Sequence, residues 1–222
     1  MRDAIYRLLD RHIWICHDYA KRPLKGFYYP GAPSSITFLD LDGTLMPDIG
    51  PGGLLRGNRI YPVWESIRSN VKNTSWVIIT NQSCFARQER FRIRDILRYI
   101  RFWNLLVRKL RIDAVLVCHH HPEALSRKLR QECSFRKPAG FLIANYAEMK
   151  NIDLATSSLI GDRITDAIAA TSAGISNTAL IYNSKLFEEN QSGSIPIWDH
   201  AFFSLLSSPE ESSFCREINE II

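Results

Sequence analysis

The sequence predicts an α/β fold in which helices cover both faces of a Rossmann-like parallel sheet. Between residues 35 and 182, short apolar runs alternate with segments of helical periodicity. This alternation is typical of parallel strands that are joined by crossover helices. Polar clusters directly follow three of the apolar runs, and in open parallel sheets ligands bind beyond the carboxyl ends of the strands. The same observations therefore predict both the fold and the position of a site.

Each element follows from its local pattern. The expected strands are apolar runs bounded by polar or turn-forming residues, and they cover residues 36–39, 76–79, 114–117, 158–160 and 179–182. The expected helices carry apolar residues at helical spacing, and they cover residues 62–70, 91–110, 141–149 and 165–173. The longest of these helices also carries arginines mostly opposite its apolar stripe. We interpret them as a solvated face rather than a nucleic-acid surface.

The length of 222 residues and the mass of 25.5 kDa suit one domain with short appendages. We expect an N-terminal amphipathic helix and linker at 1–34, a core at 35–190, and a C-terminal strand and helix extension at 191–222. The helix covers residues 1–22, whose basic residues make an anionic membrane surface one candidate partner, although we favour docking on its own domain. The interval after Thr44 has room for a loop and one helix, so no large cap domain is expected.

The charge and the cysteines bound the choice of partners and compartment. A net charge of +5 and a pI of about 9.0 favour anionic ligands without choosing among sugar phosphates, nucleic acid and lipid headgroups. The five cysteines are odd in number and widely spaced, and no secretory signal or membrane span is recognisable. A cytoplasmic location is therefore expected. No pattern indicates the oligomeric state.

Asp40 and Asp42 are the strongest candidates for chemistry. They follow the first expected strand, and residues i and i+2 of a strand face the same side, so both carboxylates can point into the crevice beyond the sheet. Gly43 then permits a sharp turn. Taken alone, the pair also fits an ordinary Asx turn. A calcium loop does not fit, because Leu45 and Pro51 stand where that loop requires glycine and a bidentate acid.

The pair suits hydrolysis of a phosphomonoester, which needs a nucleophile, an acid for the leaving group and cations for the phosphoryl oxygens. Asp40 would attack phosphorus to form an aspartyl-phosphate. Asp42 would protonate the leaving alcohol and later activate water. Mg²⁺ would be held by Asp40, the backbone carbonyl of Asp42 and Asp162, with water completing the octahedron.

Three further residues would bind or neutralise the phosphoryl group. Thr80 and the backbone N–H groups near Asn81 would donate hydrogen bonds to phosphoryl oxygens. Lys137 would neutralise charge on the phosphoryl group and on the nucleophile. The expected ligand is therefore a small phosphorylated substrate.

Four ordered motifs resemble those of the haloacid dehalogenase superfamily. They are Asp-Leu-Asp-Gly-Thr at 40–44, Thr-Asn-Gln at 80–82, Arg-Lys-Pro at 136–138 and Gly-Asp-Arg-Ile-Thr-Asp at 161–166. Within that superfamily the chain resembles the histidinol-phosphate and heptose-bisphosphate phosphatase branch, and the heptose-bisphosphate enzymes most. Further runs carry this likeness: Ser83, Ala86-Arg87, Cys-His-His-His-Pro-Glu at 118–123, and Cys133. The resemblance covers about residues 35–185 and implies a Mg²⁺-dependent phosphatase with Asp40 as the nucleophile and Asp42 as the acid and base.

The resemblance also implies roles for residues outside the catalytic pair. Arg136 would contact a second phosphate or the sugar, with Arg87 a weaker candidate, and either arginine also fits a plain surface charge. Asp166 would orient Lys137 or the metal site. Departures beside the expected pocket, at Cys84 and Ala139, leave the catalytic set intact and bear on sugar specificity.

A structural zinc is implied by the same branch, in which a Cys-x-His pair and a Cys-x-Cys pair supply the ligands. This chain offers Cys118, His120 and Cys133, but Phe135 stands at the fourth position. Structural zinc sites normally have four ligands. A bound zinc and a polar loop with unliganded Cys and His therefore both remain open, and we favour the metal-free loop.

Two other functions compete with a sugar phosphatase. A nucleic-acid 3′-phosphatase shares three of the motifs and would suit a basic chain, but the Cys/His run and the motif at 161–166 resemble the sugar branch. A non-catalytic module that keeps the fold would not need an intact set of catalytic side chains. We therefore favour a phosphatase that acts on a sugar phosphate or a similar small metabolite.

Overall fold

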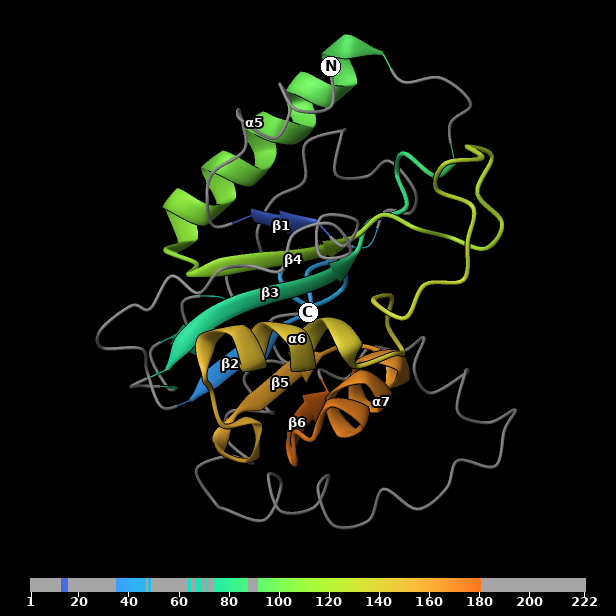
Figure 1. Cartoon of the computed structure of the whole chain (residues 1–222). Helices are drawn as coiled ribbons and strands as arrows, with labels where there is room; N and C mark the ends of the chain where they lie inside the picture. The colour runs from blue at the N-terminus through green and yellow to red at the C-terminus, as the bar shows by residue number, and fades with distance from the viewer. Residues whose placement is uncertain are drawn as a thin grey trace.

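The structure is a computed structural model, and it describes residues 13–15, 35–46, 48, 64, 67, 68, 71, 74–87 and 92–180. In these residues six parallel strands form one sheet, in the order β1-β4-β3-β2-β5-β6 (Figure 1). The strands are β1 (Ile13–Ile15), β2 (Ile36–Leu39), β3 (Ser75–Asn81), β4 (Ala114–Cys118), β5 (Ser158–Gly161) and β6 (Asn177–Leu180). The predicted parallel sheet is confirmed, and β6 begins two residues before the expected strand.

Helices cover both faces of the sheet, as predicted. They are α5 (Ile93–Leu110), α6 (Phe141–Lys150) and α7 (Ile164–Ala173), with a short 3₁₀ helix at Leu154–Thr156. Trp103 of α5 packs in one core cluster with Leu39 and Ile78. In the other cluster, Leu142 of α6 packs with Phe38. Because Phe38 and Leu39 are adjacent in β2, they point to opposite faces, and the two clusters are the two sides of the sheet.

β2 lies in the middle of the sheet, and all four of its residues are buried. A strand whose successive residues are all buried is typical of a parallel sheet that is covered on both faces. From β2 the chain moves outward through β3 to β4, and it later returns to the other side of β2 at β5. The strand order therefore reverses between β2 and β5, which is where ligands bind in open α/β sheets. The segments after β2 and β5 carry Asp40 and Asp162.

The helix predicted over residues 1–22 is wrong at 13–15. These residues form β1, which pairs in parallel with β4 from Ile13 opposite Val115 to Ile15 opposite Val117. Ile-Trp-Ile has high strand propensity, and the free edge of β4 offers backbone groups that a strand can satisfy. The sheet therefore draws a strand from the segment predicted to be an appendage, so the core is not confined to 35–190.

Several other expectations fall wholly or partly outside the described residues. They are the rest of 1–34, most of the loop and helix predicted between 47 and 73, and the extension at 191–222. Within the helix predicted at 62–70, Trp64, Ile67 and Arg68 are helical, and Trp64 and Ile67 are buried in the α5 side of the core. Among the helices that the structure describes, none has the length and apolarity needed to cross a bilayer.

Candidate active site

The turn after β2 brings the first carboxylates to the carboxyl edge of the sheet. The backbone N–H of Asp40 donates to Ile160 O at 2.9 Å, which extends the β2–β5 ladder by one residue. The chain then reverses, with Gly43 at φ +90° and its N–H donating to Met46 O at 2.7 Å. A Cβ on Gly43 would lie 2.0 Å from Oδ2 of Asp162. Glycine is thus required both for the backbone conformation and for the approach of the β5 carboxylate.

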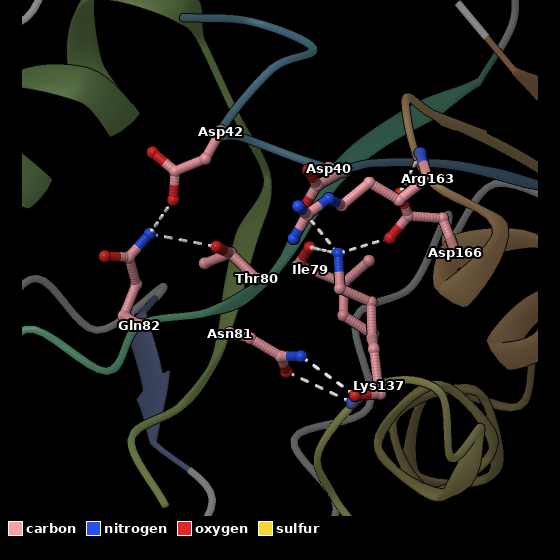
Figure 2. A network of polar contacts seen from close by, with 9 residues as sticks. All are labelled: Asp40, Asp42, Ile79, Thr80, Asn81, Gln82, Lys137, Arg163 and Asp166. Carbon is pink, nitrogen blue, oxygen red and sulfur yellow. Dashed lines mark hydrogen bonds and ion pairs between the residues drawn. The ribbon is translucent and has the colours of Figure 1, made fainter. Parts of the chain in front are cut away.

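A buried lysine connects the carboxylates that follow β2 and β5. Lys137 Nζ donates to Oδ1 of Asp40, to Oδ1 of Asp166 at 2.6 Å and to the carbonyl of Ile79 at 3.1 Å (Figure 2). An ammonium has three N–H donors, and all three are matched here. The side chains of Lys137, Asp40 and Asp166 are buried. The predicted proximity of Lys137 and Asp40 is present in the structure. Asp166 contacts Lys137, which is one of the two partners that the sequence leaves open for it.

Burial and mutual attraction act in opposite directions on the ionisation of this cluster. Burial raises the pKa of Asp40, and the Lys137 ammonium opposes that change. Burial by itself would lower the pKa of Lys137, but Asp40 and Asp166 together raise the pKa above its ordinary value. Lys137 therefore stays protonated, and its charge favours the ionised form of Asp40.

The carboxylates next to Lys137 have the chemistry of a site for a hard cation. Oxygen atoms of Asp40, Asp162 and Asp166 all lie within 4.8 Å of one another. Oδ1 of Asp162 is buried and has no hydrogen-bond partner among the described residues. Burial also raises the pKa of Asp162 to about 6. An unsatisfied carboxylate oxygen beside a second carboxylate fits Mg²⁺, which prefers oxygen ligands.

Asp166 differs from the other two carboxylates because both of its oxygens already have partners. Oδ1 accepts from Lys137, and Oδ2 accepts from the backbone N–H of Arg163 at 3.0 Å, which caps the first turn of α7. Gly161 allows this arrangement, since a Cβ there would lie 2.5 Å from Oδ2 of Asp166. Asp166 is thus held by the end of α7 and orients Lys137. Asp40 and Asp162 are the better candidates for direct metal contact.

Asp42 lies apart from the lysine cluster and contacts Gln82. Gln82 Nε2 donates to Oδ2 of Asp42 at 2.5 Å and to Oγ1 of Thr80 at 3.0 Å (Figure 2). Burial raises the pKa of Asp42 to about 6, against the effect of the hydrogen bond from Gln82. A carboxyl with this pKa can carry a proton near neutral pH, as an acid for a leaving group must. Gln82 belongs to the Thr-Asn-Gln motif at 80–82, but the sequence pattern predicts no function for its side chain.

Asn81, predicted to bind substrate, uses its side chain to hold the loop that carries Lys137. Its Nδ2 donates to the carbonyl of Lys137 at 2.9 Å, and its Oδ1 accepts from the N–H of Lys137 at 3.1 Å. The nitrogen and the oxygen of the Asn81 side-chain amide are therefore both hydrogen-bonded to Lys137, in a distant loop. The contact between a phosphoryl oxygen and the backbone N–H groups near Asn81 stays a prediction.

Several known proteins are similar to this chain in sequence. No family model matches the sequence. The D-glycero-beta-D-manno-heptose-1,7-bisphosphate 7-phosphatase of Salmonella typhi is 30% identical over 151 residues, which cover 67% of this chain and 80% of that protein. The protein of the same name from Escherichia coli (strain K12) is also 30% identical over 151 residues, with coverages of 67% and 79%. The chain belongs to this family of haloacid dehalogenase-like phosphatases.

Solved structures show the same fold. A HAD-like phosphatase from Mesorhizobium loti has a TM-score of 0.60 at 21% identity, over 87% of this chain and 89% of that chain. The D,D-heptose 1,7-bisphosphate phosphatase of B. bronchiseptica, in complex with magnesium and phosphate, has a TM-score of 0.57 at 22% identity, over 83% and 99%. The predicted superfamily and fold are confirmed. As a member of the family, the chain is a phosphoric monoester hydrolase.

The two arginines predicted to bind substrate lie near one imidazole of the phosphatase. Arg136 Nη1 donates to the carbonyl of His120 at 2.8 Å, which ties Arg136 to the loop after β4. Arg87 ends the turn after β3, where its side chain is exposed. Burial lowers the pKa of His121, and the charges of Arg136 and Arg87 lower it further. Both arginines therefore add positive charge to the same region.

The three candidate zinc ligands of the phosphatase, which are Cys118, His120 and Cys133, lie close together. Cys118 Sγ lies 3.8 Å from Cys133 Sγ, and His120 Nδ1 lies 3.2 Å from the same sulfur. Two thiols and an imidazole suit zinc. Phe135 instead packs against Phe141, with ring centroids 5.2 Å apart. Within the described residues, no fourth Cys, His or carboxylate joins the cluster. The cluster therefore offers three of the four ligands that a structural zinc site normally has.

Proposed function

We propose that the chain is a Mg²⁺-dependent phosphatase that hydrolyses a phosphomonoester of a sugar or a similar small metabolite, with a heptose bisphosphate as the first candidate. One observation carries the proposal: a buried lysine is shared by Asp40 and Asp166, beside the unsatisfied oxygen of Asp162. This combination concentrates a nucleophile and a cation site at the switch point of the sheet. Relatives at 30% identity are named for a heptose bisphosphate.

In the proposed reaction, an oxygen of Asp40 attacks phosphorus while the bond from phosphorus to the leaving oxygen breaks. The leaving oxygen takes the bonding electron pair and accepts a proton from Asp42. Asp42 then removes a proton from water, which attacks the aspartyl-phosphate, releases phosphate and regenerates Asp40. Mg²⁺ held by Asp40, Asp162 and the carbonyl of Asp42 would supply positive charge beside the phosphoryl oxygens.

Lys137 and Thr80 would bind the transferring group. Lys137 is fixed by three acceptors and stays protonated, so its charge is present before the substrate arrives. A fixed, buried charge needs little reorganisation during the reaction and acts in a medium of low polarity. Arg136 and Arg87 are the candidates for a second anionic group of the substrate, because the positive charges of both act on the same residue, His121.

Phosphate release tests the proposal. The purified protein is incubated with Mg²⁺ and a panel of sugar mono- and bisphosphates, and inorganic phosphate is measured. We expect turnover by the wild type and a loss of at least about 1,000-fold in Asp40→Asn, since the nucleophile is removed. Glu148→Gln, an exposed carboxylate of α6, is the matched control and should retain activity.

Mass spectrometry after an acid quench should find a phosphoryl adduct on the peptide that contains Asp40. Equal activity of Asp40→Asn and wild type would contradict the mechanism. Chelation of Mg²⁺ should abolish turnover, and activity that survives chelation would contradict the metal requirement. A 3′-phosphorylated oligonucleotide in the panel tests the nucleic-acid alternative.

A further inference from the structure

We propose that Gln82 is a positioning residue that orients two groups through hydrogen bonds from a single amide nitrogen. One is the Asp42 carboxyl, which protonates the leaving group, and the other is the Thr80 hydroxyl, which binds the phosphoryl group. The inference rests on the proposed function and deepens it. The sequence pattern predicts no function for Gln82. The geometry indicates one, because Gln82 Nε2 donates hydrogen bonds to both Asp42 and Thr80.

Gln82 is held firmly enough to serve in this way. Its backbone N–H donates to the carbonyl of Cys118 at 2.8 Å, which ties the residue to the end of β4. Its side chain is 4% exposed. The preceding residue, Asn81, is fixed by two hydrogen bonds to Lys137. Two consecutive side-chain amides at the end of β3 thus contact three catalytic candidates: Asp42 in the turn after β2, Thr80 in β3 and Lys137 in a distant loop.

The orientation of the Gln82 amide follows from its partners. Whether Asp42 is ionised or carries its proton on Oδ1, its Oδ2 atom can only accept a hydrogen bond. The Gln82 amide must therefore turn its NH₂ group, and not its oxygen, toward Oδ2 of Asp42. An NH₂ group has two hydrogens, and the two bonds to Asp42 and Thr80 account for both. The Thr80 hydroxyl therefore accepts from Gln82, and its own proton is left to be donated elsewhere. A phosphoryl oxygen bound beside Thr80 is the acceptor that the proposed reaction provides.

The same bond defines which oxygen of Asp42 works as the acid. Gln82 holds Oδ2, so Oδ1 is left to carry the proton. When the bond between phosphorus and the leaving oxygen breaks, the electron pair goes to that oxygen and the proton passes to it from Oδ1. Asp42 becomes a carboxylate at this moment, and the N–H of Gln82 stabilises the charge that forms. Gln82 should therefore matter most when the leaving group needs a proton.

Leaving-group dependence separates this function from a merely structural one. We compare kcat/KM for a series of aryl phosphates, from p-nitrophenyl phosphate upward in phenol pKa, and for a sugar phosphate, in wild type, Gln82→Met and Gln82→Ala. A nitrophenolate is a stable anion and leaves without protonation, whereas a sugar alkoxide must be protonated as it leaves. General acid catalysis contributes about 10²–10⁴-fold to the rate. If the Asp42 carboxyl is misplaced in the Gln82 variants, we expect kcat/KM to fall by about 10–100-fold on the sugar phosphate but by less than about 5-fold on p-nitrophenyl phosphate.

Three controls make the result specific. Thr80→Val should lose a similar factor on all substrates, because a phosphate donor acts whatever the leaving group is. In an Asp42→Asn background, Gln82→Met should cause no further leaving-group-dependent loss, since the acid is already absent. Gln131→Met, an exposed glutamine, should behave as wild type.

The inference would be overturned if each Gln82 variant lost kcat/KM by the same factor on every substrate. It would also be overturned if Gln82→Met caused the same leaving-group-dependent loss in the Asp42→Asn background as in the wild type. These outcomes differ from failure of the proposed function itself. In that case the wild type releases no phosphate from any substrate, or Asp40→Asn matches it. Thermal unfolding of each variant identifies any that does not fold, and the two different replacements at Gln82 keep the test decisive.

Discussion

Gly43→Ala tests whether the turn after β2 serves the metal site rather than the chain reversal alone. The added Cβ would lie 2.0 Å from Oδ2 and 2.5 Å from Cγ of Asp162, whereas ordinary contacts begin at 3.4 Å. Asp162 or the turn must withdraw by about 1.4 Å to relieve the overlap. A misplacement of about 1 Å in a catalytic group can cost about 100-fold in rate. We therefore expect kcat to fall by about 100-fold and the Mg²⁺ concentration for half-maximal activity to rise.

Gly174→Ala is the matched control for backbone strain. Gly174 ends α7 at φ +98°, close to the +90° of Gly43, but a Cβ there meets nothing within 4 Å. Both variants should lose about 1–2 kcal/mol of stability from the left-handed conformation, or about 2–8 °C in Tm. Only Gly43→Ala should lose activity. Wild-type kcat and Mg²⁺ dependence in Gly43→Ala would refute the claim that Asp162 needs the space.

Two further predictions concern the cysteines. Burial raises the pKa of the Cys84 thiol to about 12, so it stays neutral at pH 8 and should resist iodoacetamide in the native protein but react in urea, as read by peptide mass spectrometry; equal rates would contradict its burial. Because the native pKa is raised, the contribution of Cys84 to the free energy of unfolding is retained below the unfolded pKa of about 8.5 and falls as pH rises above it. Phe135→Cys should complete the partial zinc site and retain about one zinc per chain after dialysis against a chelator, where wild type retains much less. A variant that holds no more zinc than wild type would show that Phe135 is not the missing position.

Local sequence was sufficient for the elements that bury both faces or that precede a sharp turn. β2 could be predicted because three of its four residues are large and apolar and the fourth is β-branched. Asp40 and Asp42 could be placed at its end because residues i and i+2 of an extended chain face the same side. The needs of phosphoryl transfer then pointed to Thr80 and Lys137, and both lie in the four ordered motifs that carry the family resemblance. Hydrogen bonds between distant residues left no such local mark. The pairing of Gln82 with Asp42 spans 40 positions, and no residue pattern encodes which amide meets which carboxylate.

The strand at 13–15 shows the limit of periodicity as evidence. Apolar residues at helical spacing run through the first part of the chain, and they predicted a helix. The edge of β4 offers unpaired backbone groups, and the three residues pair there as β1. Tertiary pairing of this kind overrides a local preference, because the partner strand comes about a hundred residues later in the sequence and contributes nothing to the local pattern.

The sequence by itself determined the fold class, the family, and the identity of the carboxylates and the lysine at the end of the sheet. These are local or ordered features, which burial, strand geometry and motif order specify directly. Only the tertiary structure decided that Asp166 shares Lys137 with Asp40, that Asn81 holds the lysine loop, and that Gln82 joins Asp42 to Thr80. It also decided that three candidate zinc ligands meet without a fourth among the residues that the structure describes. Each of these depends on where β2, β3, β4 and β5 end relative to one another, and that arrangement exists only once the sheet is assembled.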